Sequence, residues 1–518
     1  MPEVQTIIGG FKGLDENIAS FDKGTKENLT RSMTNVLALH GKIWGRKGLE
    51  KLYGLTTQAT GQYIGLAQFE QADETSYLIG VTESKVYSIS AGGLSDITGT
   101  ALTSSNDAIL SWDIIDDTFI FTNGVDPVRK WAGTGNTAAI GGSPPLARRV
   151  HNFEDFLFLG DVTISSIRYP SRIRYSDDWD ATWDEANEIN LVETHLGIKA
   201  WDVIGRTLYV YKGDGVVAIR FIGGPTRFSQ HKVPFALGIQ APLSLVNIPQ
   251  LGHIFLATDF NFYLNANGAI NKLPPNMRET LHEDMAPGWS QFAVGSSVPE
   301  DDLYMLFFSS GGSWADKRLI FNYRTGEWAV DSYPNHRVIR ATGIRLTSGD
   351  DWASDGQLWQ DDSTTWLDEV ASVSFNLVTA MDDRRVYRMD VGHLDDTFTV
   401  TRTYFTDWQD YGYKGSKTFN GVDMWCERTP GGFIAVSIAS DYKDTFLQRR
   451  IYSLDGLTPE DGEVLIQHRT MPIHGNKFNI KLEFIHTRAE QVVLKELGPV
   501  WSPLGGQYQT PARLYATQ

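Results

Sequence analysis

The chain has 518 residues, of which 41% are apolar and 21% charged, a composition typical of a globular protein rather than a disordered or fibrous one. It carries 46 basic and 63 acidic side chains, so the formal charge is −17, which disfavours a surface that grips nucleic acid through its phosphates. The acidity is equally compatible with a solvated surface and with a passage through which DNA slides, because carboxylates repel phosphates.

The single cysteine, Cys426, excludes an intrachain disulfide framework and a cysteine-based zinc site, as is typical of folding in a reducing cytoplasm. We expect this thiol to be buried and inert. The first residues, Met1 to Val4, lack the basic and apolar regions of a signal peptide, and no run of about 18 apolar residues occurs. We therefore expect neither export by a signal peptide nor a membrane-spanning helix.

Paired apolar segments recur at intervals of roughly 40 to 50 residues, the spacing of β-propeller blades. In each unit a polar turn leads into a short apolar strand, and a second turn leads into a strand rich in Tyr, Phe, Ile or Val. The pairs are 77–81 with 86–89, 119–121 with 128–131, 156–159 with 172–175, 208–211 with 216–219, 254–257 with 262–264, 303–307 with 319–323 and, more weakly, 341–344 with 356–359. Such near-continuous apolar runs are typical of strands covered on both faces. They predict a propeller of six or seven blades over residues 56–369, with unrelated hairpins in two sandwiches as the alternative.

Few segments have a helical pattern. Apolar side chains fall at helical spacing within residues 26–39, although threonine and valine lower the helix propensity there. A second short helix is predicted near residues 276–285. Residues 1–55 are otherwise predicted to form an N-terminal arm and the entry strand of the propeller.

After about Glu369 the predicted strands become longer and alternate cleanly between apolar and polar residues. The best case is 478–484, where Phe478, Ile480, Leu482 and Phe484 would face one side of a sheet. Similar strands are predicted at 398–404, 433–440 and 491–497, separated by turn-rich segments. Residues 370–518 are therefore predicted to form a C-terminal antiparallel β-sandwich or platform domain, which makes the chain all-β.

Two stretches resemble the tail nozzle, or tail hub, proteins of podovirus-type bacteriophages. In the first, Gly9-Gly10 precedes Asn35 and the run 41–49, in which Arg46 and Gly48 hold the positions of an Arg-x-Gly element that opens the propeller in that family. The second, 172–183, is similar to a strand followed by Ser-Asp and a nearby Trp, with a shorter Ser-Asp element here. The similarity in layout covers most of the chain, and its specificity lies in the order of the parts.

The resemblance implies a homohexameric ring at the distal end of a virion tail, assembled in the host cytoplasm and docked on an adaptor ring below the portal. It also implies contact with tail fibres or spikes. The chain would then be a structural, non-enzymatic subunit of the tail tube, forming a conduit that retains double-stranded genomic DNA and passes it during ejection. The alternative is a peripheral receptor-binding or glycan-binding tail protein, and a cellular propeller adaptor comes third.

Residues 176–183 also approximate the Ser-x-Asp-x-Gly-x-Thr-Trp turn of sialidase-like propellers. Ser176, Asp178, Thr182 and Trp183 are in register, and Asp180 stands where glycine is usual. The turn is a folding element in which the Asp side chain caps backbone amides and the Trp packs inward, so it predicts a propeller rather than catalysis. A glycan-cleaving enzyme would also need a convergent nucleophile and acid, which one sequence cannot show.

Other signatures of chemistry are absent or weak. The nearest approach to a phosphate-binding loop is 412–417, which does not match that motif. His253, His282 and His336 are predicted in loops or at strand edges, where surface or hydrogen-bonding roles outweigh metal ligation. The acidic run of Asp177, Asp178, Asp180, Asp184 and Glu185 lacks the spacing of a calcium loop and favours a solvated turn. We therefore predict no catalytic residue, no cofactor and no metal site.

The mechanism expected from these features is a tube of several copies whose stiff propellers form the wall and whose loops narrow the bore. Candidate gating loops are the glycine-rich segments 133–142 and 309–312, because glycine lowers the cost of reshaping a loop. The 15 tryptophans suit a fold of short strands, a subunit interface or carbohydrate binding, and the sequence does not separate these three roles.

Overall fold

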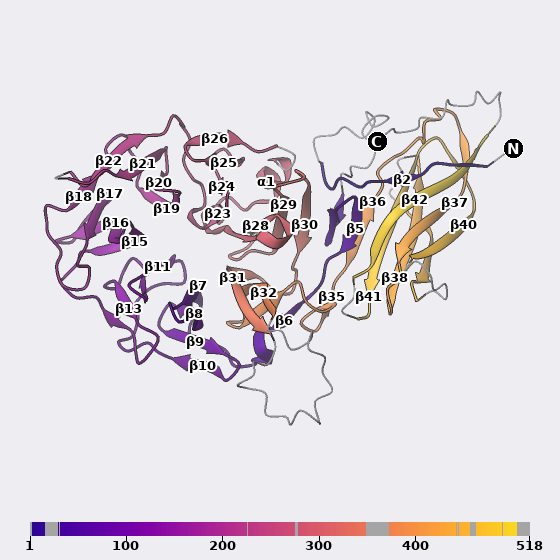
Figure 1. Cartoon of the computed structure of the whole chain (residues 1–518). Helices are drawn as coiled ribbons and strands as arrows, with labels where there is room; N and C mark the ends of the chain where they lie inside the picture. Colours follow the sequence, from indigo (N-terminus) through magenta and orange to yellow (C-terminus); the bar gives the residue numbers. More distant parts are fainter. Residues whose placement is uncertain are drawn as a thin grey trace.

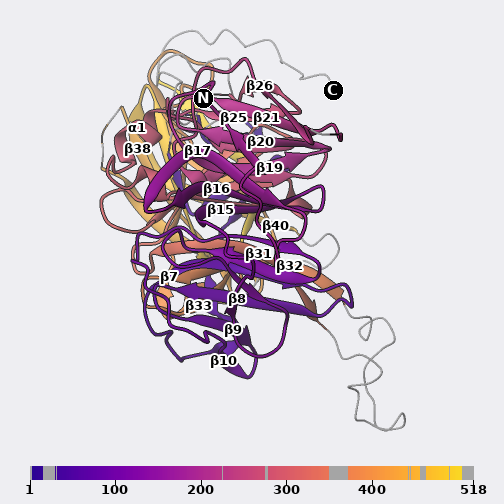
Figure 2. The same cartoon turned by 90° about the vertical axis from the view of Figure 1, so that its left-hand side faces the viewer.

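The computed structural model describes residues 3–15, 30, 32–224, 226–274, 278–348, 372–441, 443, 445–455, 463–488 and 491–504. Within these ranges the chain is almost entirely β and forms a ring of sheets beside a two-sheet sandwich (Figure 1). When the molecule is turned by 90°, the yellow strands of the sandwich lie behind the ring (Figure 2). The predicted all-β fold is confirmed.

Seven sheets form a β-propeller, which settles the predicted six or seven blades at seven. In each of the first six blades four antiparallel strands follow in chain order, and the first is the innermost. Blade one contains β7 (Tyr63–Glu70), β8 (Ser76–Thr82), β9 (Val86–Ser90) and β10 (Gly93–Asp96). Blade two contains β11 (Ser111–Ile115), β12 (Thr118–Thr122), β13 (Arg129–Trp131) and β14 (Ala138–Ala139). Blade three contains β15 (Leu146–Phe153), β16 (Phe156–Ile164), β17 (Ile167–Ser176) and β18 (Glu188–Asn190). Blade four contains β19 (Ile198–Ile204), β20 (Thr207–Lys212), β21 (Val216–Phe221) and β22 (Phe228–Lys232). Blade five contains β23 (Val246–Ile248), β24 (Gly252–Leu256), β25 (Phe262–Ala266) and β26 (Ala269–Lys272). Blade six contains β27 (Val294–Val298), β28 (Leu303–Phe308), β29 (Lys317–Asn322) and β30 (Trp328–Ser332).

The first six predicted strand pairs correspond to the second and third strands of the first six blades. These middle strands are covered by the neighbouring blades on both faces, and every residue of β20, β24 and β28 is buried. The seventh pair is different. Its first half, 341–344, lies in an innermost strand, and its second half, 356–359, lies outside the described residues.

The seventh blade is closed by a strand from near the N-terminus. Its sheet runs in the order β31 (Val338–Ser348), β32 (Ser372–Met381), β33 (Val386–Met389), β6 (Leu49–Lys51), β34 (Leu394–Asp395) and β35 (Phe398–Thr399). β6 pairs antiparallel with β33, so the ring closes by joining segments more than 300 residues apart. The boundary predicted at 369/370 therefore falls inside this sheet, because β32 and β33 belong to the propeller.

A buried arginine reinforces the closure of the ring. Arg340, at the start of the innermost strand of blade seven, is 3% exposed. Its Nε donates to the carbonyl of Ile64 at 2.7 Å and one of its terminal nitrogens to that of Ala108 at 2.9 Å, which ties blade seven to blades one and two. Burial lowers the pKa of Arg340 to about 10.

The second body is a sandwich of two antiparallel sheets, and both contain N-terminal strands. One sheet runs β4 (Val36–Leu39), β5 (Lys42–Gly45), β42 (Val493–Pro503), β37 (Lys417–Glu427) and β40 (Glu463–Gly475), with β1 (Val4–Gln5) and β2 (Ile8–Gly9) also on β42. The other runs β3 (Met33–Thr34), β36 (Arg402–Phe405), β41 (Phe478–His486), β38 (Gly432–Ser440) and β39 (Leu447–Ser453). Residues 1–55 are thus not a separate arm where the structure describes them, because β1 to β5 complete the C-terminal body.

Several predicted elements can be checked in this part of the chain. The helix predicted at 26–39 is wrong over residues 33–39, where β3 and β4 lie, because pairing with β36 and β5 overrides a weak helix propensity. The helix near 276–285 is confirmed as α1 (Arg278–Asp284). In β41 the four apolar side chains from Phe478 to Phe484 are at most 1% exposed, as predicted. The strand predicted at 398–404 is instead two short strands, β35 and β36.

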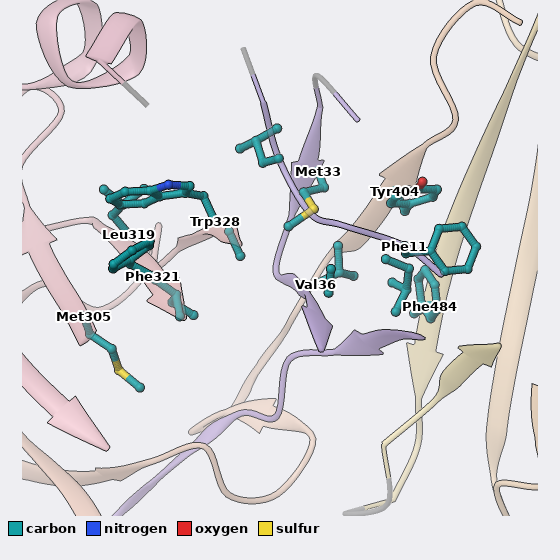
Figure 3. Packing of buried hydrophobic residues seen from close by; sticks show 14 of the residues in the cluster. Phe11, Met33, Val36, Met305, Leu319, Phe321, Trp328, Tyr404 and Phe484 are labelled. Atoms are coloured by element: carbon teal, nitrogen blue, oxygen red, sulfur yellow. The ribbon is translucent and has the colours of Figure 1, made fainter. Parts of the chain in front are cut away.

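One hydrophobic cluster extends from blade six into the sandwich (Figure 3). On the propeller side, Trp328 stacks on Phe321 with ring centroids 4.3 Å apart. Met33 and Val36 lie between this pair and the aromatic side chains of the sandwich (Figure 3). Backbone hydrogen bonds accompany the packing, such as that from the amide of Asn35 to the carbonyl of Val330 at 3.1 Å. The two bodies therefore share a core.

The remaining short helices are the 3-10 turns η1 (Leu52–Gly54), η2 (Pro242–Ser244), η3 (Ser290–Phe292) and η4 (Pro299–Asp301). Among the described residues, no helix has the length and apolar character needed to cross a membrane. Cys426 is buried in β37, and burial raises the pKa of its thiol to about 12, which fits the predicted inert side chain.

Candidate functional site

A cluster of buried ion pairs lies where the propeller meets the sandwich. Arg318 of β29 donates to Asp331 at 2.6 Å and 2.9 Å and to Asp390 at 2.7 Å and 2.8 Å. Arg46, just after β5, donates to Asp395 at 2.7 Å. The side chains of Arg318 and Asp331 are only 2% and 1% exposed. Charges removed from water to this degree are stable only when they are paired. Arg318 therefore fixes blade six against blade seven, and Arg46 ties the segment after β5 of the sandwich to β34 of the propeller.

The pKa values in this cluster reflect burial and pairing together. Burial opposes the charge of Arg318, but Asp390, Tyr333 and Asp331 raise its pKa well above the usual value. Burial likewise opposes ionisation of Asp390, yet Arg318 holds the pKa of that carboxyl below its usual value. Asp331 is the opposite case, because burial outweighs its arginine partners and raises its pKa.

Arg46 and Gly48 of the Arg-x-Gly element, and Asn35 before it, have roles at this junction. An added Cβ at Gly48 would lie 1.9 Å from the carbonyl oxygen of Leu394, so only glycine allows the close approach of β6 and β34. Asn35 adopts a φ of 56° and its side-chain oxygen accepts hydrogen bonds from the Ser332 amide at 2.8 Å and from Nε of Arg46 at 3.2 Å. The sequence motif therefore specifies how the two bodies join.

The turn at 176–183 is a folding element, but its capping groups differ from those predicted. The Ser176 hydroxyl donates to the carbonyl of Thr182 at 2.6 Å and accepts from the Asp178 amide at 3.1 Å. It is the main-chain carbonyl of Asp178, not its carboxylate, that accepts from the amides of Ala181 and Thr182. Asp180, in the glycine position, pairs with Lys130 of blade two and accepts from the Gly141 amide at 2.8 Å. Trp183 is half-buried and packs against the cluster beneath the turn.

The three predicted histidines lie far apart in the sequence and have different surroundings. His253 is neither in a loop nor at a strand edge, because it lies within β24 with no exposed surface, and Tyr211 is 2.9 Å from its Nδ1. His282 is exposed on α1, and His336 is 7% exposed in the loop before β31, packed on Tyr387. Among the described residues, no group of three or more His, Cys, Asp or Glu side chains could hold a metal ion.

The two candidate gating loops are held by local contacts. Gly141 and Gly142 pack directly on the backbone of the 176–183 turn, where an added Cβ at Gly141 would lie 2.0 Å from the Asp180 carbonyl. In the 309–312 turn the Ser309 hydroxyl donates to the Gly312 carbonyl at 2.6 Å. The 412–417 segment leads into β37, and its lysine, Lys417, is fully buried with a pKa that burial lowers to about 8.

A hollow lies along the central channel of the propeller. It consists of two adjoining cavities of about 540 Å³ and 490 Å³, which share Ile109, Arg149, Lys199 and Pro242 in their walls. The larger cavity is lined by the first strand of every blade, from β7 to β31, together with the η2 turn before β23. All described lining residues of both cavities come from the propeller, so the sandwich does not contribute to the channel.

Two pairs, each of a carboxylate and an imidazole, lie at the larger cavity, whose lining includes Asp113, His151 and Asp202. Nδ1 of His151 on β15 lies 2.6 Å from the carboxylate of Asp113 on β11. Nε2 of His253 lies 3.9 Å from the carboxylate of Asp202 on β19. Burial would lower the pKa of His151, but Asp113 raises it above its usual value, whereas burial lowers the pKa of His253. Sequence reasoning singled out His253 but missed both pairs, because their members come from different blades. Asp113, His151 and Asp202 lie on successive inner strands, and His253 lies on the second strand of blade five.

The buried ion pair of blade six can be tested against an exposed pair in the same blade. Arg318→Met leaves Asp331 buried without its partner, so we expect the free energy of unfolding to fall by about 3–5 kcal/mol. Arg324→Met is the matched control, because Arg324 pairs with Asp302 at 2.8 Å while its side chain is 77% exposed. Its loss should cost less than about 1 kcal/mol. Urea unfolding followed by tryptophan fluorescence measures both values, and equal losses would contradict the role given to the buried pair.

The His151–Asp113 pair predicts a direction for titration. Because the pKa of folded His151 is raised, its contribution to stability is complete below the pKa of the unfolded chain and is lost as pH rises through the folded value. Asp113→Asn should lower the pKa of His151, as measured by NMR titration of histidine-labelled protein. Asp107→Asn, at the mouth of the channel, is the control and should leave it unchanged. An unaltered titration in Asp113→Asn would show that the pair does not form.

No protein-family model matches the chain, and no curated protein matches its sequence. Among solved structures the chain is similar to BamB from Moraxella catarrhalis, at 10% identity and a TM-score of 0.37, over 74% of this chain and 97% of that one. It is also similar to the Pan2 WD40 domain of Neurospora crassa, at 11% identity and a TM-score of 0.38, over 67% and 95% of the two chains. The likeness is one of β-propeller fold alone.

Proposed function

We propose that the chain is a structural, non-enzymatic subunit of the distal tail tube, or nozzle, of a short-tailed bacteriophage. In this proposal several copies, six by the family resemblance, form a ring that retains genomic DNA in the virion and passes it during ejection. The observation that carries the proposal is the role of Asn35, Arg46 and Gly48. These residues, which resemble the nozzle family's entry element, are the ones that join the propeller to the sandwich.

The dimensions of the propeller support a bore formed between copies rather than within one. The cavities of about 540 Å³ and 490 Å³ in the channel have the size of small-molecule pockets. A DNA duplex is far larger, so each propeller would serve as a piece of wall. A closed ring gives each subunit two heterologous contacts. The proposed partners are sister copies, an adaptor ring below the portal, and tail fibres or spikes.

The charge and the stiffness of the molecule also support a conduit. The chain carries a formal charge of −17, and carboxylates on a passage wall would repel DNA phosphates and let the duplex slide. The shared core and the buried Arg46–Asp395 pair hold the propeller against the sandwich, so a wall of such subunits would resist pressure from packaged DNA.

The alternative, a receptor-binding or glycan-binding protein at the tail periphery, predicts tryptophans exposed together on one rim. Of the 15 tryptophans, three lie outside the described residues, at 352, 359 and 366. The twelve within the described ranges are all buried or half-buried. Their burial favours the packing role of these side chains over a carbohydrate platform.

The oligomeric state of the purified full chain separates these proposals. We expect native mass spectrometry to give a closed ring of six copies, and negative-stain electron microscopy to show a central bore wide enough for a DNA duplex. The ring should persist on dilution, because every copy in a closed ring is held by two contacts. A monomer or trimer that binds sugars would contradict the conduit and support the peripheral role.

A further inference from the structure

We propose that the mouth of the propeller channel binds a small ligand through an oxyanion group, a carboxylate or a phosphate. The site is the cavity of about 490 Å³, at the ends where the innermost strands of blades two to four begin. The inference does not depend on ring formation, because all the described lining residues belong to one propeller.

Three cationic side chains that form no ion pair lie together in this mouth. Arg149 donates through Nε to the carbonyl of Lys199 at 2.6 Å and through a terminal nitrogen to the carbonyl of Arg148 at 3.0 Å. The Lys199 ammonium donates to the carbonyl of Ile239 at 3.1 Å. In the described part of the chain, no carboxylate forms an ion pair with Arg148, Arg149 or Lys199. Neutral carbonyls thus position Arg149 and Lys199, and the nearby Asp161 acts on Arg149 without forming a direct ion pair with it.

Arg168, a fourth cation in the same lining, differs from these three because a carboxylate neutralises its charge. Arg168 binds the carboxylate of Asp161 through two hydrogen bonds, at 2.7 Å and 2.5 Å. Asp107 is the other carboxylate in the lining, so four basic side chains face two acidic ones. This excess of positive charge is unusual in a chain that has 63 acidic and 46 basic residues. It would also attract anions from solution.

Desolvation makes the charges of Arg149 and Lys199 costly in the absence of a ligand, whereas Arg148 is exposed. Burial lowers the pKa of Arg149, Asp161 partly offsets this, and the neighbouring Arg148 and Arg168 add to the lowering, so that the pKa is about 10. Burial also lowers the pKa of Lys199. An oxyanion placed among these groups would relieve the repulsion and form charge-assisted hydrogen bonds, which a planar guanidinium can make in pairs.

The rest of the channel offers space, apolar surface and hydrogen-bond acceptors for the uncharged part of such a ligand. Phe292 and Val125 supply apolar surface at the mouth, and Val125 is 50% exposed. Deeper in, Trp112 and Trp201 are among the residues that line the adjoining cavity. The carboxylates of Asp113 and Asp202 lie in the same wall and can accept hydrogen bonds from hydroxyl groups. The arrangement fits a small hydroxylated acid or phosphate ester, with its oxyanion at the mouth.

Calorimetric titration of the full chain with inorganic phosphate, glucuronate and glucose tests the site. We expect saturable binding of phosphate, of glucuronate or of both, no binding of glucose, and weaker binding at higher salt. Tighter binding of phosphate would identify the recognised group as a phosphate, and tighter binding of glucuronate would identify it as a carboxylate. Lys199→Gln and Arg149→Gln should each weaken the affinity about tenfold, because each removes a charge-assisted hydrogen bond.

Arg206→Gln is the matched control, because Arg206 is 82% exposed, pairs with Glu154 and does not line the channel. Its affinity for the anion should equal that of the unaltered chain. Thermal unfolding establishes that each variant is folded, and Lys199→Gln carries the test if Arg149→Gln is not. The proposal is overturned if neither anion binds, if glucose binds as tightly, or if Lys199→Gln binds as the unaltered chain does. If a duplex oligonucleotide binds while phosphate and glucuronate do not, and if Lys199→Gln abolishes its binding, the site belongs to nucleic acid instead.

Discussion

Both bodies of the molecule are completed by the same short segment of chain. Residues 33–51 supply β3 and β4–β5 to the two sheets of the sandwich and then β6 to the last blade of the propeller. A propeller needs a closing strand, and here that strand arrives directly from the sandwich. The path between them passes through Arg46 and Gly48, where the backbone approaches Leu394 too closely for any side chain at residue 48. Neither body is complete without the segment, so each constrains the other.

The physical role of the buried charges follows from this constraint. A hydrophobic core alone would tolerate small shifts of one body against the other, whereas paired charges out of water require fixed partners. Arg318 binds Asp331 within blade six and also Asp390, which directly follows β33 of blade seven. These bonds lie within the propeller, whereas Arg46, which follows β5 of the sandwich, binds Asp395 of β34 and so spans the two bodies. A subunit joined in this way suits a role in which force is borne without deformation, as in the proposed tube wall.

The sequence was informative where a strand is buried on both faces. The second and third strands of blades one to six are near-continuous apolar runs, so their spacing predicted the propeller. The innermost strands gave a weaker signal because they line a polar channel; most residues of β11, for example, are only partly buried. The last blade and the N-terminal strands were misassigned for a different reason. β3, β5 and β6 have pairing partners hundreds of residues away, and local periodicity carries no information about such partners.

The residues that meet in the channel could not be predicted from the sequence either. Asp113, His151, Arg149 and Lys199 are ordinary polar residues in short strands, and their meeting depends on the register of separate blades. The turn at 176–183 was recognised from its residues, yet its hydrogen bonds are made by Ser176 and Asp180 rather than by the carboxylate of Asp178. The spacing of the motif predicts the turn, whereas the atoms that form its hydrogen bonds can be identified only in the structure.

Hydrogen exchange in increasing urea, followed by mass spectrometry of the full chain, tests most directly whether the two bodies form one unit. Exchange reports which segments open together. Amides of β33 and β6 in the propeller and of β5 and β42 in the sandwich should lose protection at the same urea concentration. Loss of protection in β42 while β33 stays protected would show two independent bodies and contradict the account.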